Sequence, residues 1–319
     1  MSHHLYVLGA TGNYLGYSCW AWVDYYYLLT GFFTAKHFKI NQGHKYVSEN
    51  LSKDVMCYTL KKFKSFAPYV LVAVLVQYII ELCSYALNGH IVYGLRNIVV
   101  DMPYEILCLS STGLVYAKLA PIWYLSAMLI ALPIVIYCML KFKDIWYIAS
   151  WVIPILYYGR YGLNTAREWP NDMLRAFICI TLGTFVYLLA VELNKVKIHS
   201  NAKKIAFTVC EIGCWMFTAY ITIFNKNMLN FLVLLWVVHC VIMFSGKSMT
   251  YSVRSRFFIY LGELSLPMFL THWAIGCLMN MIIRDFNTKI LLYYIVTIGV
   301  SIVLLWIKKK FIMLYKKDL

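Results

Sequence analysis

The sequence predicts an all-α fold, a polytopic bundle of membrane-spanning helices. Hydrophobic residues make up 62% of its 319 residues and charged residues only 13%, where an average soluble domain carries about 25% charged residues. Aromatic residues account for 17%, and the mean hydropathy is +0.67. A soluble fold of this length could not bury so much apolar surface, so the composition indicates a chain whose solvent is mostly lipid.

Nine apolar runs, one of them short, are predicted to cross the membrane, where a span needs roughly 17 to 25 residues. They cover residues 13–35, 66–87, 122–140, 145–159, 173–192, 204–224, 229–245, 257–283 and 290–312. A tenth segment over 98–117 contains Asp101, Pro103 and Glu105, which suits a re-entrant or interfacial helix better than a span. The sequence shows no internal repeat and no linker, so we expect one membrane-embedded domain over 1–319.

Basic residues gather on one predicted side of the membrane. With the loops assigned to alternate sides, 21 of the 29 Lys and Arg residues fall on one face. By the positive-inside rule this face, and with it the C-terminus, is cytoplasmic. The formal charge of +15 therefore orients the helices and does not indicate a nucleic-acid partner. The same assignment leaves Met1 on the outer side, which predicts a helix missing upstream of it.

The longest polar stretch, residues 36–65, is expected to be a cytoplasmic basic loop. Val47, Leu51, Val55 and Tyr58 lie at helical spacing within it, which indicates an amphipathic segment on the inner leaflet. Its lysines serve orientation and attraction to anionic lipid, or they contact an anionic cofactor.

Motifs for metal or nucleotide chemistry are absent from the sequence. The ten cysteines are scattered through apolar segments, and none has metal-ligand spacing, so no metal site is expected. A nucleophile elbow, a Walker loop and a Rossmann fingerprint are also lacking.

Charged and titratable groups in predicted spans need a partner or a function, since a charge at the bilayer centre costs roughly 2.5–3.5 kcal/mol. Asp24 is either a structural lock held by neighbouring hydroxyls or a functional acid. His272, near the middle of its span, is either a packing residue or a proton-transfer group. His3 and His4 are either part of a solvated terminus or a proton-transfer pair.

Three arginines, Arg160, Arg167 and Arg175, surround a predicted outer loop that also carries amides and acids. Guanidinium forks with amides suit a hydroxyl-rich or anionic ligand. The alternative is an interfacial network of salt bridges.

Two further groups face the same predicted outer side. Glu105 follows Pro103 in the re-entrant segment, where an acid would line a polar cavity. Trp123 and Tyr124 open a helix after Pro121, either as aromatic-belt residues or as cavity-lining ones.

Four segments in order resemble the acyltransferase-3 family of membrane-bound O-acyltransferases, over essentially the whole chain. They are WVDYYYLLTGFF at 22–33, KKFKSFAPY at 61–69, PIWYLSAM at 121–128 and LGELSLPMFLTHW at 261–273. Thr30 stands where the family usually has serine, which keeps the hydroxyl. Lys62 and Lys64 stand where arginines are common, which keeps the charge but loses the bidentate fork.

A fifth segment, HHLYVLG at 3–9, resembles the histidine end of the motif on the family's first helix. In the family an arginine precedes this histidine, and the pair is taken to be central to catalysis. The corresponding arginine would lie before Met1. The resemblance therefore implies that the chain lacks it and most of the first helix.

The resemblance implies transfer of an acyl group, usually acetyl, from cytoplasmic acyl-CoA to a hydroxyl of a surface polysaccharide or a lipid-linked saccharide. The setting it implies is the bacterial cytoplasmic membrane, with lipid around the chain. His3 is then the candidate base, with His4 beside it and Asp24 as an orienting acid, and Lys61, Lys62 and Lys64 are the candidate contacts for the acetyl-CoA phosphates. The remaining candidates line the cavity or hold the acceptor: Thr30, Glu105, Trp123, Tyr124, Arg160, Arg167, Arg175, Ser265 and His272.

Two other functions remain open at this point. A transporter or flippase of lipid-linked sugars would also have many spans and intramembrane charges, although paired interrupted helices in two related halves are not visible in the sequence. A truncated, inactive homologue of the acyltransferases would also fit, because the arginine of the catalytic pair is missing.

Overall fold

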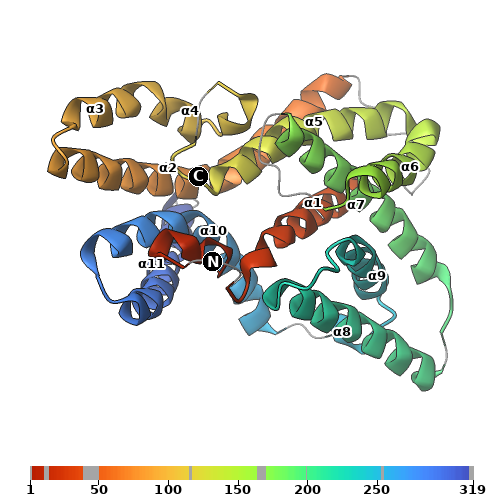
Figure 1. The fold of residues 1–319 in the computed structure, drawn as a ribbon. Helices are drawn as coiled ribbons and strands as arrows, with labels where there is room; N and C mark the ends of the chain where they lie inside the picture. The colour runs from red at the N-terminus through yellow and green to blue at the C-terminus, as the bar shows by residue number, and fades with distance from the viewer. Residues whose placement is uncertain are drawn as a thin grey trace. The chain divides into compact units, whose positions relative to one another are not determined.

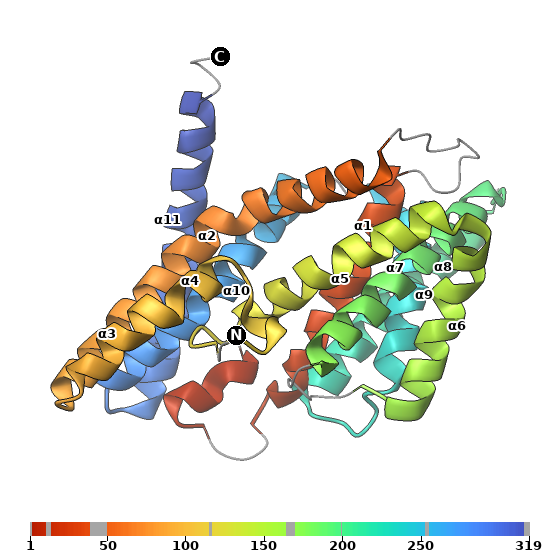
Figure 2. The same ribbon diagram turned by 90° about the horizontal axis from the view of Figure 1, so that it is seen from above.

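The computed structural model describes residues 2–10, 14–38, 50–114, 117–163, 170–198, 200–252 and 255–315. Within these ranges the chain is helical and contains no β-strand (Figures 1 and 2). The α-helices are α1 (Trp22–Phe38), α2 (Leu51–Leu87), α3 (Ile91–Val100), α4 (Met102–Ile106), α5 (Ile122–Lys141), α6 (Lys143–Tyr161), α7 (Asn171–Lys195), α8 (Asn201–Ile223), α9 (Phe231–Ser245), α10 (Arg256–Ile282) and α11 (Phe286–Tyr315). The 3-10 helices are η1 (Ser2–Leu8), η2 (Tyr17–Ala21), η3 (Ser110–Thr112) and η4 (Met249–Ser252).

A helix stands at each of the nine predicted spans. Six of them, α2, α5, α7, α8, α10 and α11, are long and apolar enough to cross a membrane. The helices α1 and α9 are shorter, at 17 and 15 residues. The prediction of a polytopic helical membrane protein is confirmed.

The predicted basic loop over 36–65 is partly helix. Residues 39–49, which include Val47, lie outside the described residues, and α2 begins at Leu51 and runs for 37 residues. Such a helix is about 55 Å long, well beyond the roughly 30 Å hydrocarbon core of a bilayer. The lysines of residues 51–64 therefore lie on a helical extension of the span that follows them.

The segment over 98–117 forms no single helix of spanning length within its described residues. Instead α3 ends at Val100, α4 occupies Met102–Ile106, and the chain turns through Cys108 and Gly113, which both have positive φ. This agrees with the prediction that the segment does not span.

The chain divides into two compact units, each built from separated stretches. Unit 1 comprises Met1–Tyr14, Leu60–Ser126 and Ser255–Leu319. Unit 2 comprises Leu15–Thr59 and Ala127–Arg254. Unit 1 thus unites the N-terminal residues with the last two helices.

Unit 1 is built around α10, which packs against α11 and against η1. Leu8 of η1, Ile275 and Met279 of α10 and Tyr293 of α11 form one buried apolar cluster. Because Leu8 is 1% exposed, the N-terminal residues are anchored in this core.

Unit 2 is built around α7, which packs against α1, α6 and α9. Two glycines bring α1 and α7 close together. A Cβ at Gly31 would overlap the carbonyl group of Ile180, and a Cβ at Gly183 would overlap that of Leu28. Glycine is therefore required on both faces of this crossing, as in closely packed membrane helices.

Candidate functional site

Three histidines from opposite ends of the sequence meet in unit 1, and we call them the histidine cluster: His3 and His4 of η1 and His272 of α10. The ring centroids of His4 and His272 lie 5.0 Å apart, and those of His3 and His4 lie 4.9 Å apart. Their proximity follows from the packing of η1 on α10. The structure thus brings together His3 and His4 with His272, for which the sequence left packing, proton transfer and cavity lining open.

His272 has one ring nitrogen committed and the other available. Its Nδ1 lies 3.1 Å from the carbonyl oxygen of Met268, one turn earlier on α10. Because a carbonyl can only accept a hydrogen bond, Nδ1 carries the proton and Nε2 of the neutral ring keeps its lone pair. The Nε2 atom is buried and has no hydrogen-bond partner among the described residues. In this tautomer Nε2 is the ring atom that can accept a proton.

Aromatic side chains surround the histidine cluster. The Tyr6 hydroxyl lies 3.3 Å from Nδ1 of His4, and the Trp273 ring is 5.2 Å from that of His4. The ring centroid of Phe269 lies 5.9 Å from that of His272 and 5.5 Å from that of Tyr124. Tyr124 therefore borders the cluster through Phe269. Within the cluster His272 is 1% exposed, which keeps bulk water from its ring.

Glu105 anchors the backbone that leads into α5. Its carboxylate is 0% exposed and accepts hydrogen bonds from Tyr78 Oη at 3.0 Å, from the amide of Lys118 at 2.5 Å and from that of Leu119 at 3.1 Å. Burial raises the pKa of Glu105 above its ordinary value, against the lowering effect of these hydrogen bonds. Trp123 belongs to the same region, since its carbonyl accepts a hydrogen bond from Ser111 at 3.0 Å.

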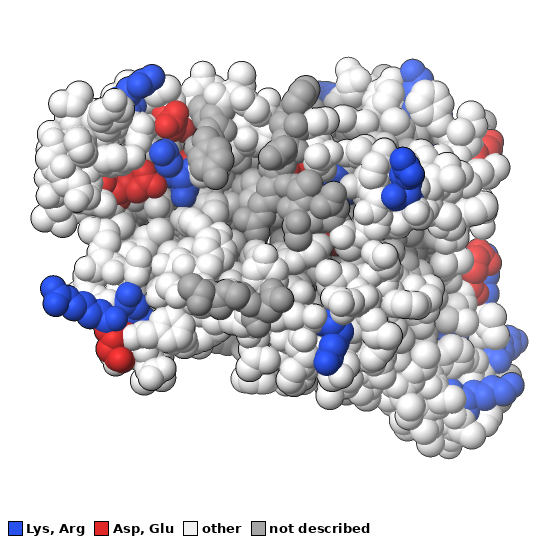
Figure 3. Space-filling view, viewed as in Figure 1, with Lys and Arg blue, Asp and Glu red and all other residues white. Residues whose placement is uncertain are grey.

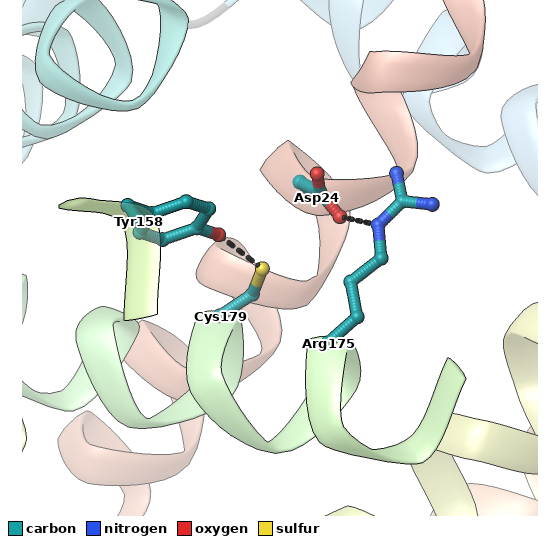
Figure 4. Close-up of polar contacts among 4 residues, drawn as sticks. All are labelled: Asp24, Tyr158, Arg175 and Cys179. Carbon is teal, nitrogen blue, oxygen red and sulfur yellow. Dashed lines mark hydrogen bonds and ion pairs between the residues drawn. The ribbon is translucent and has the colours of Figure 1, made fainter. Parts of the chain in front are cut away.

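Two further candidates, Asp24 and Arg175, form a buried ion pair in unit 2, between α1 and α7 (Figure 4). Asp24 Oδ1 lies 2.5 Å from Arg175 Nε, and the side chains are 1% and 5% exposed. The guanidinium also lies 5.0 Å from the centre of the Trp20 ring. The sequence allowed a structural lock at Asp24 through hydroxyls, and the partner found here is a guanidinium instead.

Beside this pair, Tyr158 of α6 and Cys179 of α7 make a second polar contact. The Tyr158 hydroxyl lies 2.7 Å from Cys179 Sγ, and Figure 4 shows Cys179 on the same face of α7 as Arg175. Polar groups of α1, α6 and α7 are thus collected in one buried patch of unit 2.

The remaining cavity candidates lie apart from the histidine cluster or have local partners. The Thr30 hydroxyl donates to the Tyr26 carbonyl at 2.9 Å, and the Ser265 hydroxyl donates to that of Gly262 at 2.7 Å. Arg160 is exposed at the end of α6, and Arg167 lies outside the described residues.

The three candidate lysines, Lys61, Lys62 and Lys64, lie on α2 at the end of unit 1 where α11 also carries lysines. Lys61 and Lys64 are exposed and Lys62 is half-buried. Lys308 of α11 donates to the Ser65 carbonyl at 2.6 Å, one residue beyond Lys64.

A second α11 lysine ties the same end of unit 1 to α10, since Lys309 forms an ion pair with Glu263. The sequence singled out neither Lys308 nor Lys309 as a site residue. The signal for them was the run of three lysines, 308–310, at the end of the last span. We call this part of unit 1, with the lysines of α2 and α11, its basic end. The contacts of Lys308 and Lys309 join three helices there: α2, α10 and α11.

A family model described as an acyltransferase domain matches residues 2–306. The chain belongs to the acyltransferase-3 family. The match includes all five motif segments and all three members of the histidine cluster. No curated protein and no solved structure matches the chain. Membership of this family makes the chain a membrane acyltransferase in general terms.

Proposed function

We propose that the chain transfers an acyl group, acetyl in the first instance, from acyl-CoA to a hydroxyl of a surface polysaccharide or a lipid-linked saccharide. Acyl transfer follows from the family. The proposal adds the donor, the acceptor and the residues that act on them.

The histidine cluster is the observation that carries the proposal. An acceptor hydroxyl is a weak nucleophile, so it needs a base to take its proton as its oxygen attacks the thioester carbonyl. The resemblance to the family favours His3 for this role, whereas the geometry favours His272, whose buried Nε2 has no hydrogen-bond partner among the described residues. The C–O bond then forms as the C–S bond breaks, and the imidazolium returns its proton to the departing thiolate.

The basic end of unit 1 supports binding of the donor phosphates. Lys309 pairs with Glu263, which precedes His272 by nine residues on α10, or about 14 Å along the helix axis. The pantetheine arm of coenzyme A is a long flexible chain, so phosphates held by Lys61 and Lys64 are compatible with a thioester near His272. By the positive-inside rule these lysines face the cytoplasm, where acyl-CoA is found.

The proposal is tested by supplying acetyl-CoA with a radiolabelled acetyl group to membrane vesicles that contain the full chain and an O-acetylatable glycan. Label is expected in the glycan as a base-labile ester. His272→Ala is expected to reduce the rate by a factor of about 10² or more, the usual contribution of a general base. His37→Ala, on α1 in unit 2, is the matched control and should retain the wild-type rate.

Two results would contradict the proposal. Wild-type activity in His272→Ala, His3→Ala and His4→Ala would exclude the histidine cluster from the reaction. Movement of a lipid-linked saccharide across the membrane without any acyl ester would instead support a transporter.

A further inference from the structure

A polar pocket lies in unit 1 where α2 ends and α3 begins. It has a volume of about 560 Å³, within the range of about 300–1,000 Å³ typical of small-molecule sites. In the space-filling view, acidic and basic side chains lie together on the surface over α3 and α4 (Figure 3). The pocket is lined by Glu81, Ser84, Tyr85, Asn88, His90 and Lys118. None of them is among the candidate site residues that the sequence indicated.

Glu81 presents a carboxylate oxygen that is ready to accept hydrogen bonds. Its Oε1 accepts from Gln77 Nε2 at 3.1 Å, which fixes the carboxylate. Its Oε2 is buried and has no hydrogen-bond partner among the described residues. The side-chain amide oxygen of Gln77 is also buried and has no hydrogen-bond partner among the described residues. Gln77 as a whole is 2% exposed. Buried acceptors without donors are costly. Of these two residues Glu81 lines the pocket, so a ligand bound there can supply a donor to its carboxylate.

Lys118 places the opposite charge on the pocket lining. The Lys118 backbone amide donates a hydrogen bond to the Glu105 carboxylate, which fixes the position of the Lys118 backbone. Ser84, Asn88 and His90 add groups that can donate or accept. The lining therefore carries one acidic and one basic side chain, Glu81 and Lys118, whose formal charges are opposite.

This chemistry selects among the ligands of an acyl transfer. A balanced lining gives no net attraction to the phosphates of coenzyme A, and its polar groups would be left unpaired by an acyl chain. A neutral molecule with many hydroxyls supplies both donors and acceptors, and the Tyr85 ring offers a face for its C–H groups.

We propose that this pocket binds a sugar unit of the acceptor, an assignment that rests on the proposed acyl transfer. Its link to the histidine cluster runs through Gln77, whose Nε2 lies 3.9 Å from Cys277 Sγ on α10, five residues after His272. The pocket, Gln77 and the cluster all belong to unit 1. One unit would then hold the acceptor sugar, the base and the donor phosphates.

The test uses the full chain in detergent micelles and saturation-transfer NMR with the methyl glycosides of glucose, galactose and N-acetylglucosamine at millimolar concentration. At least one glycoside is expected to show transfer from the wild type. Glu81→Gln keeps the shape of the side chain but removes the charge, and should weaken binding roughly tenfold, as expected for a charge-assisted hydrogen bond. Lys118→Met is an independent second variant. Asn97→Ala, on α3 outside the pocket lining, is the control and should bind as the wild type does.

The outcomes separate this proposal from the proposed function. No signal with any glycoside from folded wild type, or equal affinity in wild type, Glu81→Gln and Lys118→Met, would overturn the pocket assignment even if the labelled acetyl group is still transferred. Glycoside binding that weakens in both pocket variants would support the assignment, and would do so even if no acetyl transfer occurs and the proposed function fails.

Discussion

Asp24 and Arg175 form an ion pair across the α1–α7 contact, with 2.5 Å between Oδ1 and Nε. Both side chains are buried, which makes each the necessary partner of the other. A buried charge that loses its partner is left in a medium of low dielectric constant, where it is strongly unfavourable. The pair therefore joins α1, with the aromatic motif around Asp24, to the central helix of unit 2.

Removing one member of this pair should destabilise the protein more than removing both. Asp24→Leu or Arg175→Leu alone is expected to cost about 3–5 kcal/mol, whereas the double variant should recover most of that loss because no unpaired charge remains. Urea unfolding in detergent measures the difference. The exposed pair of Lys195 and Glu192 is the control, and its removal should cost less than about 1 kcal/mol. A double variant as unstable as the single ones would refute the lock.

The glycines of the α1–α7 crossing should not tolerate a methyl group. Gly31→Ala and Gly183→Ala would each place a Cβ inside backbone atoms of the facing helix, so the helices must separate. We expect a lower melting temperature for both variants. Gly213→Ala on α8 is the matched control, because nothing lies within 4 Å of its added Cβ and alanine is favoured over glycine in helices by up to about 1 kcal/mol. Equal melting temperatures in all three variants would contradict this packing.

Glu105 should contribute to stability in proportion to the hydrogen bonds it accepts. Tyr78→Phe removes one donor and leaves the two amide contacts, so a loss of about 1 kcal/mol is expected. Glu105→Leu leaves the buried amide of Leu119 and that of Lys118 unpaired, at about 1–3 kcal/mol for each group. Unfolding free energies of the two variants test this order. A Tyr78→Phe variant less stable than Glu105→Leu would contradict it.

The lysines of α2 should affect donor binding and leave the chemical step unchanged. In the double variant Lys61→Gln, Lys64→Gln, KM for acetyl-CoA is expected to rise roughly tenfold at unchanged kcat, since one charge-assisted contact is worth about 1.5–3 kcal/mol. The effect should shrink with added salt, because exposed charges are screened. Lys143→Gln, an exposed lysine on α6, is the control. A fall in kcat with KM unchanged would rule out a role confined to donor binding.

Much of the helical architecture could be predicted from composition and apolar runs, because a helix that crosses the lipid needs a long run of apolar residues. The apolar runs do not predict where a helix begins or ends. The polar residues before Phe66 end the apolar run, yet Lys, Leu and Met are good helix formers, so α2 continues back to Leu51. Polarity therefore marked the end of the apolar run and not the end of the helix.

In the candidate site, too, the sequence identified single residues but not the contacts between them. The motif segments singled out His3, His4 and His272 one by one, but their meeting depends on η1 packing against α10, a contact between the N-terminal residues and a helix in the last quarter of the chain. The sequence places Arg175 with the outer-loop arginines because it follows them closely along the chain. Its partner on α1 is 151 residues away and is defined only by the helix crossing.

The polar pocket could not be inferred from sequence because its lining residues have no shared motif. Glu81 alone would be interpreted as a carboxylate near a helix end. Its proposed role rests on the fixed Oε1, the buried Oε2 and the placement of Lys118 by Glu105.

The most direct test of the central claim is the stoichiometry of acyl transfer by purified chain in vesicles. Free coenzyme A thiol and glycan-bound labelled acetyl ester are measured in the same sample over time. We predict that they form in equal amounts, and that His272→Ala lowers the rate of both by a factor of about 10² or more while His37→Ala alters neither. Ester formation that continues at the wild-type rate in His272→Ala, or thiol release with no ester at any acceptor, would contradict the account.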